Sequence, residues 1–309
     1  MALKSNKKGI FFTALVLVIA TILLLTYAIS TIPTDRSSLK KRVQTMNEFL
    51  ISSESDLERQ LYVMGFRAIF VFNNYIAQQG AYISNPEISF QELAFNGTLY
   101  QQNQSLFQEI TFRDIEDTLQ QRAQKLNINI SLLNPMLTLT QSEPWKIDIA
   151  LSTTIVMTDE NNLVSWNRPL TITARVPVQG LEDPLYIVNT NGLVTVKVKQ
   201  TPHTIFVENT NITSLLNHTL SSYYRSHTDA PSFLNRLQGN LSASQYGIES
   251  LVNLQKLSSQ GVPTQQKTVV DYIYFSTQNP AHNGVSGMPS WFRLDAAHLA
   301  YYNATHLAT

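Results

Sequence analysis

The residue types that most often do chemistry gather in the last third of the chain. All six histidines lie there: His203, His218, His227, His282, His298 and His306. With Asp229, Asp271 or Asp295 beside them they could hold a zinc-like ion, because imidazole and carboxylate groups are its usual ligands. None of the spacings is that of a metal motif, and His298 and His306 would be about 12 Å apart on a straight helix. We therefore predict no metal or cofactor site from these residues.

The usual catalytic motifs are also missing. Gly284-Val285-Ser286-Gly287 is one residue short of a nucleophile elbow. The chain has neither a glycine-rich phosphate loop nor a zincin motif. The acidic groups at 114–117, 159–160 and 182–183 could serve a glycosidase only if two of them faced each other across a cleft, and we expect them to be solvated instead. The sequence thus predicts that the protein is not an enzyme.

Aromatic residues are also frequent in the last third. They could form a surface that binds a sugar or a peptide, or the core of a domain that lacks disulfides. We favour the core for the eight of them that cluster there: Tyr223, Tyr224, Tyr272, Tyr274, Trp291, Phe292, Tyr301 and Tyr302.

Composition narrows the class of protein. The 309 residues carry 22 basic and 22 acidic side chains, so the chain offers no basic surface for a nucleic acid. It has no cysteine, which excludes disulfides, thiolate metal sites and cysteine nucleophiles. Stability must therefore come from the packed core.

An apolar stretch near the N-terminus, 10–30, carries no charge. Eighteen helical residues span roughly 27 Å, close to the hydrocarbon thickness of a bilayer. The segment before it contains Lys4, Lys7 and Lys8 and no acid, which favours a cytoplasmic N-terminus. We therefore predict a single-pass membrane protein with a cytoplasmic tail at 1–9, a transmembrane anchor at 10–30 in membrane lipid, and its bulk outside the cytoplasm. A cleaved secretory signal ending near Ala28-Ile29-Ser30 is the alternative.

The residues Lys7-Lys8-Gly9 before this apolar stretch resemble the processing site of archaeal type IV pilin precursors. The resemblance implies a cut between Gly9 and Ile10, after which the apolar helix would serve as the bundling stem of a filament. The chain differs from the usual pattern at Ala14, where glutamate is common in the family. Blocks in the last third, at 180–192, 230–237, 247–252 and 269–276, resemble membrane-anchored archaeal envelope proteins of unassigned activity, a resemblance that brings no catalytic residue with it.

A stem helix is predicted at 31–80. Pro33 should interrupt the helix just after the apolar stretch. Helical periodicity then places Leu39, Val43, Met46, Leu50, Leu57, Leu61, Met64 and Ala68 on one stripe, missing only at Ser53. From Tyr62 to Ile76 the helix is apolar on nearly every side and should be buried, and Gly80 should end it.

A head is predicted at 81–179. We expect a loop at 81–104, a helix at 105–125, and then a switch to strict alternation. Strands are predicted at 126–132, 136–141, 146–157 and 170–178, with a turn at Asn134-Pro135. The alternation indicates an antiparallel β-meander with one dry face, which the stem should cover.

The remaining residues, 180–309, predict a smaller mixed α/β part. Asn191-Gly192 indicates a hairpin. Helices are expected near 212–225, 232–237, 248–256 and 291–302, and a strand at 268–276. The predicted fold class is therefore α+β: a transmembrane helix and a long amphipathic stem helix packed on an antiparallel β-meander, followed by this mixed part.

Seven sequons allow N-glycosylation if the bulk of the protein is exported: Asn96, Asn103, Asn129, Asn211, Asn217, Asn240 and Asn303. Three functions remain open. The first is a structural or adhesive envelope protein, possibly a pilin-like subunit whose partners are copies of itself or other envelope proteins bound through the N-terminal helix. The second is a receptor or glycan- or peptide-binding ectodomain. The third is a membrane-tethered hydrolase.

Overall fold

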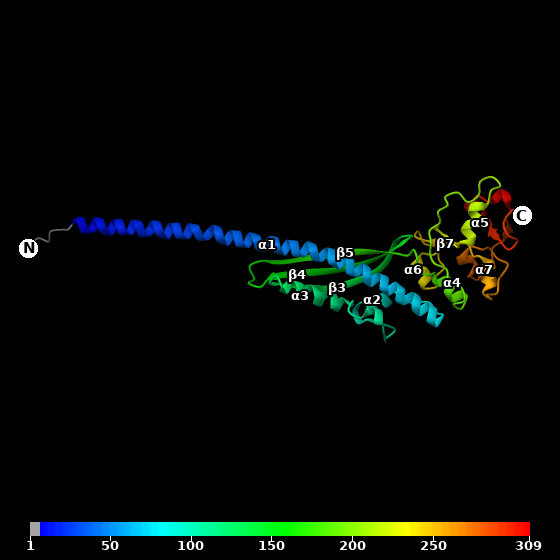
Figure 1. The fold of residues 1–309 in the computed structure, drawn as a ribbon, viewed down its shortest axis with the longest axis horizontal. Helices are drawn as coiled ribbons and strands as arrows, with labels where there is room; N and C mark the ends of the chain where they lie inside the picture. Colours follow the sequence, from blue (N-terminus) through cyan, green and yellow to red (C-terminus); the bar gives the residue numbers. More distant parts are fainter. Residues whose placement is uncertain (1–6) are drawn as a thin grey trace, which may run out of the picture.

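The computed structural model describes the backbone of residues 7–309 and the side chains of 11–27 and 38–309. Helix α1 (Lys7–Gln79) dominates the molecule at 73 residues, about 110 Å of helix. Its N-terminal half extends away from the body of the protein, and its C-terminal half lies along the three-stranded sheet (Figure 1). The C-terminal part of the chain lies at the opposite end of the molecule from the N-terminal end of α1 (Figure 1).

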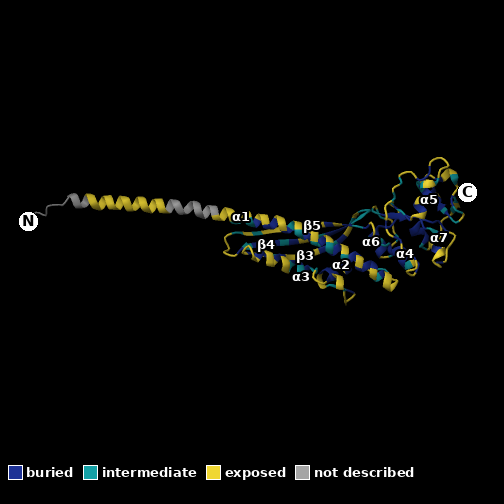
Figure 2. Ribbon diagram, in the orientation of Figure 1, coloured by how far each residue is buried: buried dark blue, intermediate teal, exposed yellow. Residues whose placement is uncertain are grey.

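The predicted transmembrane anchor is wrong. Within the described residues, no helix combines the length and the apolarity needed to cross a membrane, which also overturns the predicted single-pass localisation. The side chains that the structure describes in this region, 11–27, are exposed along their whole length (Figure 2).

Pro33 does not separate an anchor from a stem, because α1 continues through it. A proline inside a helix removes one backbone hydrogen bond but leaves those of the neighbouring turns. Helix α1 ends where predicted. Gly80 follows its last residue with a positive φ of 63°, and the Gly80 N–H donates to the carbonyl of Ile76 at 2.9 Å.

The C-terminal half of α1 buries the predicted stripe from Met46 onward, whereas Leu39 and Val43 are exposed. Ser53, the gap in the stripe, is buried too, since its hydroxyl donates to the Phe49 carbonyl at 2.7 Å and needs no water. The prediction that the helix is buried on every side after residue 62 is wrong. Three aromatic residues, spaced four apart, lie on its solvent side: Tyr62, Phe66 and Phe70.

The head contains an antiparallel sheet of strands β3 (Ile128–Glu143), β4 (Lys146–Asp159) and β5 (Ser165–Pro177), in that order. Alternate residues form its dry face, including Ile147, Ile149 and Leu151 in β4. Helix α1 contacts β5 and β4 on this face, and helices α2 (Pro86–Asn96) and α3 (Phe112–Gln124) contact β3. One layer of helices therefore covers one face of a sheet (Figure 1).

The details of the head differ from the sequence prediction in three places. Asn134-Pro135 is not a turn between strands but a bulge inside β3, where Asn134 has a φ of 51° and the register shifts. The predicted loop at 81–104 contains α2, which Asn85 caps by accepting the N–H of Ile88, followed by the short strands β1 (Thr98–Leu99) and β2 (Gln102–Asn103). Helix α3 is shorter than predicted and starts at a capping box between Thr111 and Asp114, after the 3-10 turn η1 (Ser105–Phe107).

The C-terminal part consists of short elements: α4 (Pro184–Asn189), α5 (Thr213–Leu220), β6 (Tyr224–Ser226), α6 (Phe233–Leu237), β7 (Ile248–Ser250), α7 (Leu254–Ser259), α8 (Asp271–Tyr274), β8 (His282–Gly284), β9 (Arg293–Asp295), α9 (Ala296–Tyr301) and η2 (Thr305–Leu307). Its strands form two-stranded antiparallel pairs, β6 with β7 and β8 with β9. The prediction of a helix at 232–237 is confirmed by α6.

Other predictions in this part are wrong. Asn191-Gly192 ends helix α4 instead of turning a hairpin, and both residues have positive φ. The predicted helix at 248–256 begins with strand β7, and the predicted strand at 268–276 contains α8. The predicted helix at 291–302 is wrong only in its first part, where β9 precedes helix α9. These elements are three to eight residues long, too short for a helical or strand period to show in the sequence.

The C-terminal part is joined to the stem by specific contacts. Asn73 on α1 donates from Nδ2 to the Glu182 carbonyl at 3.0 Å. Asn189 donates to the Tyr82 hydroxyl at 2.9 Å, and the Leu234 N–H donates to Gln141 at 3.2 Å. Helix α4 also packs against α1. The end of the stem and the C-terminal part are therefore packed together.

Candidate functional site

Strand β7 separates two buried polar clusters in the C-terminal part. Successive residues of a strand face opposite sides, so Glu249 faces one cluster while Ile248 and Ser250 contact the other. All three residues of β7 are buried. Every polar group there must find a partner inside the protein.

The first cluster surrounds Arg236, whose side chain has no solvent access. Its Nη1 lies 2.6 Å from Asp183 and 2.9 Å from Asp271, and its Nη2 donates to the Ile248 carbonyl. Tyr224 donates to Asp183 at 2.7 Å, and Ser250 donates to Asp271 at 2.8 Å. Burial opposes the charge of Arg236, but the two aspartates outweigh it and raise its pKa. Both carboxylates are paired with Arg236 and accept hydrogen bonds from neighbouring hydroxyls. We therefore interpret this cluster as an ion network that stabilises the fold.

The second cluster consists of His227, Glu249 and His298. One ligand-type atom of each lies within 4.8 Å of those of the other two. Glu249 Oε2 is 2.9 Å from His227 Nδ1 and 3.3 Å from His298 Nε2. Neither contact has the geometry of a hydrogen bond, so Glu249 Oε2 and His227 Nδ1 are buried atoms without a hydrogen-bond partner.

A second layer of groups orients these three side chains. Tyr302 donates to Glu249 Oε1 at 2.7 Å, which leaves Oε2 directed at the histidines. Asp295 lies 2.8 Å from His298 Nδ1, and Thr268 donates to Asp295 at 3.0 Å. The Tyr272 hydroxyl lies 3.2 Å from His298 Nε2.

The pKa values follow from this arrangement. Burial alone would raise the pKa of Glu249, but His227 and His298 outweigh it and lower the pKa to about 2. Burial alone would lower the pKa of His298, but Asp295 and Glu249 raise it to about 9. Without a bound cation, His298 is therefore a charged imidazolium between two carboxylates at neutral pH.

Three separate stretches of backbone bring the cluster together. His227 follows β6, Glu249 is the middle of β7, and His298 lies in the first turn of α9, which Asp295 caps by accepting the His298 N–H. Gly247 allows the stretches that carry His227 and Glu249 to meet. A Cβ at this position would lie 2.3 Å from the His227 carbonyl oxygen and 2.0 Å from that of Ala230.

The structure thus assembles two of the six histidines, together with Asp295, around a residue that the sequence did not single out. Glu249 has no spacing to His227 or His298 that could have indicated it. His203, His218, His282 and His306 lie outside the cluster, and Asp229 is exposed. Asp271 belongs to the Arg236 cluster instead.

The other chemical candidates from the sequence do not converge on an active site. The expectation of solvated acids is wrong for Asp159 and Asp183, which are buried and paired with Arg42 and Arg236. The prediction that the eight late aromatic residues form a core is confirmed, because none of them is exposed. Five of the eight are buried: Tyr224, Tyr272, Tyr274, Phe292 and Tyr302.

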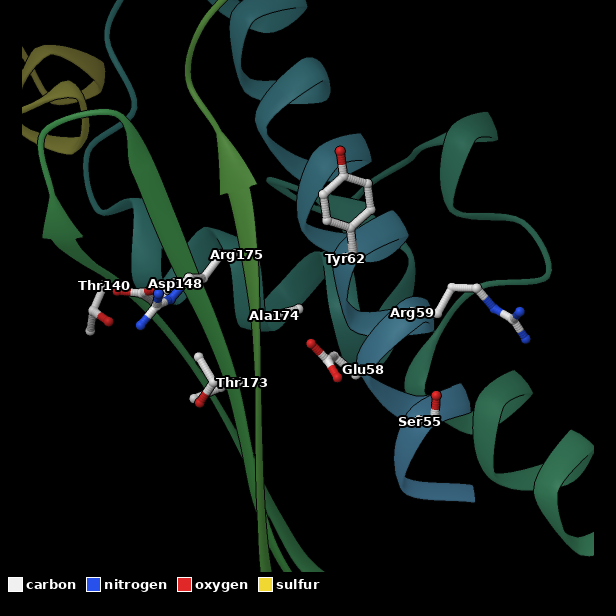
Figure 3. Close-up of a pocket in the computed structure, with 10 residues that line it drawn as sticks. Ser55, Glu58, Arg59, Tyr62, Thr140, Asp148, Thr173, Ala174 and Arg175 are labelled. Carbon is white, nitrogen blue, oxygen red and sulfur yellow. Dashed lines mark ion pairs between the residues drawn. The ribbon is translucent and has the colours of Figure 1, made fainter. Parts of the chain in front are cut away.

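A hollow of about 890 Å³ lies between α1 and the edge of the sheet (Figure 3). Thr140, Asp148 and Thr173 lie on one side of the strand that carries Ala174, and Glu58 lies on the other with the helix. Asp148 pairs with Arg175 at 3.3 Å. The side chains do not point toward a common centre, so this surface has no catalytic geometry.

The predicted processing residues, Gly9 and Ile10, have backbone in α1, but the exposure of this site lies outside what the structure describes, and the cut stays a prediction. All seven sequon asparagines are exposed, and their glycosylation stays a prediction.

The exposed part of the stem is the other candidate site. Large apolar side chains between Phe11 and Tyr27 are 45–71% exposed. Thr21 donates its hydroxyl to the carbonyls of Leu17 and Val18, at 2.8 and 2.9 Å, and Thr26 does the same with Ile22 and Leu23, at 2.9 and 3.0 Å. This surface therefore presents hydrocarbon on all its sides.

No protein-family model, curated protein or solved structure matches the chain.

Proposed function

We propose that the protein is a structural subunit that assembles with copies of itself through the apolar half of its long helix. The observation that carries this proposal is the continuous exposed apolar surface of residues 11–27, here called the stem surface. Burial of one Val, Leu, Ile or Phe side chain contributes about 1.5–3 kcal/mol. Assembly that covers such a surface therefore has a strong driving force.

The distribution of side chains around α1 favours several copies over a simple pair. Leu15, Val16, Leu17, Val18 and Ile19 are consecutive and all exposed. At 100° per residue, five consecutive positions cover the full circumference of a helix. A single partner helix would cover one side of the stem surface and leave the others in water. A bundle of stems covers all of them.

Polar groups in the stem surface do not oppose such packing. The hydroxyls of Thr21 and Thr26 already donate to carbonyls of their own helix. Burying a satisfied hydroxyl avoids the penalty for an unpaired donor. Small residues at Ala14 and Ala20 leave room for neighbouring helices to approach.

The resemblance of Lys7-Lys8-Gly9 to pilin processing sites supports the same function. In that family the apolar helix after the cut forms the bundling stem, and the long helix continues over an antiparallel sheet. Helix α1 has this arrangement over strands β4 and β5 of the three-stranded sheet. We propose in addition that a cut between Gly9 and Ile10 removes the charged residues before the stem surface, a step that assembly does not require.

Charges placed in the stem surface test the assembly. Leu17 and Leu24 are 66% and 68% exposed, and the matched control positions Leu163 and Ile205 outside the stem are 64% and 61% exposed. We expect the wild-type chain and the Leu163→Lys/Ile205→Lys control to sediment as large particles. Electron microscopy should show that these particles have a uniform width. The Leu17→Lys/Leu24→Lys variant should remain monomeric with an unchanged circular dichroism spectrum. A monomeric wild type, or assembly that survives both stem charges, would contradict the proposal.

Processing has its own test. Mass spectrometry of the protein from its native source should find an N-terminus at Ile10. An intact Met1 on assembled material would remove the cleavage step and leave the stem-driven assembly standing.

A further inference from the structure

We propose that His227, Glu249 and His298 form a binding site for one divalent transition-metal ion of the zinc class. The site is independent of the stem surface and of assembly. The ion would join the segment after β6, strand β7 and helix α9, which are separated in the chain by 22 and 49 residues (249 − 227 and 298 − 249).

The atoms lie at distances that suit a shared ion. Ligand atoms 2.0–2.2 Å from a tetrahedral ion are about 3.3–3.6 Å from each other. Glu249 Oε2 is 3.3 Å from His298 Nε2 and 2.9 Å from His227 Nδ1, and all three atoms lie within 4.8 Å of one another. The two histidine nitrogens, at most 4.8 Å apart, would have to approach each other by up to about 1.5 Å to complete the geometry. Two imidazoles and one carboxylate are an established zinc ligand set.

Two buried atoms of the cluster make ion-pair contacts but no hydrogen bond of regular geometry. Glu249 has no solvent access, yet its Oε2 has no hydrogen-bond partner, and neither has His227 Nδ1. A buried carboxylate oxygen without a partner is costly. An ion between these atoms would satisfy both at once.

The surrounding groups have the arrangement that metal sites use to orient their ligands. A metal-bound histidine usually donates its other ring N–H to a carboxylate. Asp295 occupies this position, 2.8 Å from His298 Nδ1, while His298 Nε2 faces Glu249. The hydroxyl of Tyr302 orients Glu249 in the same way, through Oε1.

Charge favours a divalent ion. Glu249 and Asp295 carry two negative charges inside the protein. An ion bound at His298 Nε2 would take the place of the proton that this ring holds without it, so the charge of the two acids would be left for the ion to neutralise. A divalent cation would neutralise the cluster, as buried charges require. The guanidinium of Arg225 stacks on Tyr301, 3.7 Å from its ring centre, instead of pairing with either acid.

The first experiment measures binding to the full chain after chelator treatment and desalting. Zn²⁺ is titrated by calorimetry, and thermal unfolding is followed with and without it. We expect one Zn²⁺ per chain at about micromolar affinity or tighter, and a higher Tm in its presence. If the wild-type chain binds no Zn²⁺ with this stoichiometry and affinity, the proposal is overturned, whatever the variants do.

Variants locate the ion. Glu249→Gln keeps an acceptor for Tyr302 and His227→Gln keeps a polar side chain, and each should weaken binding by about 100-fold or more. Asp295→Asn retains a cap for α9 and should weaken binding by about 10–100-fold. His306→Gln is the control, because His306 is exposed and outside the cluster, and it should bind as the wild type does. Equal affinity in the wild type and Glu249→Gln would overturn the proposal.

A measurement on the wild type alone covers the case in which these variants do not fold. When the chain is loaded with one equivalent of Co²⁺, the paramagnetic ion should shift or broaden the ring NMR signals of His227 and His298 and leave that of His306 sharp. Effects centred on His306 or another exposed histidine would show that the ion binds at the surface, and would reject the buried site.

Discussion

Arg236 places its Nη1 atom 2.6 Å from a carboxylate oxygen of Asp183, and neither side chain has access to solvent. Asp183 also caps helix α4 by accepting the Leu185 N–H at 2.9 Å. Arg236, on α6, bonds in addition to Asp271 at the start of α8 and to the carbonyl of Ile248 on β7. One guanidinium therefore ties together four short elements, none of which could be stable alone.

Removing this guanidinium should be costly. Arg236→Met leaves two buried carboxylates without their counter-ion, and breaking a buried ion network in this way lowers the free energy of unfolding by about 3–5 kcal/mol. Urea denaturation measures the loss. The control is Arg59→Met, since Arg59 is 71% exposed in its pair with Asp56 and such pairs contribute about 0–1 kcal/mol. Similar losses in the two variants would show that the Arg236 network contributes little.

The contact between the stem and the sheet depends on Gly65. A Cβ at this position would lie 2.4 Å from Cγ1 of Ile149, a fully buried side chain that has no room to move away. Gly65→Val should therefore force α1 off the sheet and destabilise the fold by about 1–3 kcal/mol through overpacking. Asn47→Val, at an exposed position on the same helix, should change stability by less than about 1 kcal/mol. Thermal unfolding of both variants distinguishes a packing effect from a change in helix propensity.

Gly192 has a backbone conformation that other residues resist. Its φ is 77°, and a Cβ there would meet nothing within 4 Å, so a substitution changes only the backbone energy. Gly192→Ala should lower the free energy of unfolding by about 1–2 kcal/mol. Gly192→Asn should cost less, because asparagine tolerates positive φ. Equal losses for Ala and Asn in chemical denaturation would contradict this explanation.

His218 should make the C-terminal part sensitive to acid. The ring has no solvent access and neither nitrogen has a hydrogen-bond partner. The pKa of His218 is lowered to about 3, and burial is the largest cause of this shift. The unfolded chain therefore binds a proton at His218 below about pH 6.5 that the folded chain does not bind. Stability is retained above pH 6.5 and lost progressively as the pH falls toward 3.

His218→Phe tests this linkage, because it removes the titrating group and keeps a ring beside Phe206, whose centre is 4.9 Å away. Between pH 7 and pH 4.5 the wild type should lose about 2–3 kcal/mol more of its free energy of unfolding than this variant. Urea denaturation at the two pH values measures the difference. An unchanged pH dependence in His218→Phe would show that other groups cause the acid sensitivity.

The head could be predicted from the sequence because its elements are long. Strands β4 and β5 have 14 and 13 residues, enough for strict alternation to distinguish the face that packs from the face that is wet. The buried stripe of α1 from Met46 to Ala68 could also be predicted, because it extends over several helical turns. Gly80 was correctly predicted as the end of α1. The error at Asn134-Pro135 arose because a bulge and a turn use the same residues.

The clusters around Arg236 and Glu249 could not be predicted in this way. Residues 227, 249 and 298 meet only through the packing of elements of three to six residues, and no local period marks such elements. Asn191-Gly192 shows the same limit. Its two positive φ angles suit a hairpin or a helix end equally, and the packing of α4 against α1 selects the helix end.

The amino-acid sequence by itself determined the apolar surface of the stem, the lack of disulfides and the alternation of the sheet, because each depends on residue types and on short-range spacing. Only the tertiary structure decided that Arg236 joins Asp183 to Asp271 and that Glu249 faces His227 and His298. These relationships arise when distant segments share one core, where every charge that leaves water must meet an opposite charge or a polar partner.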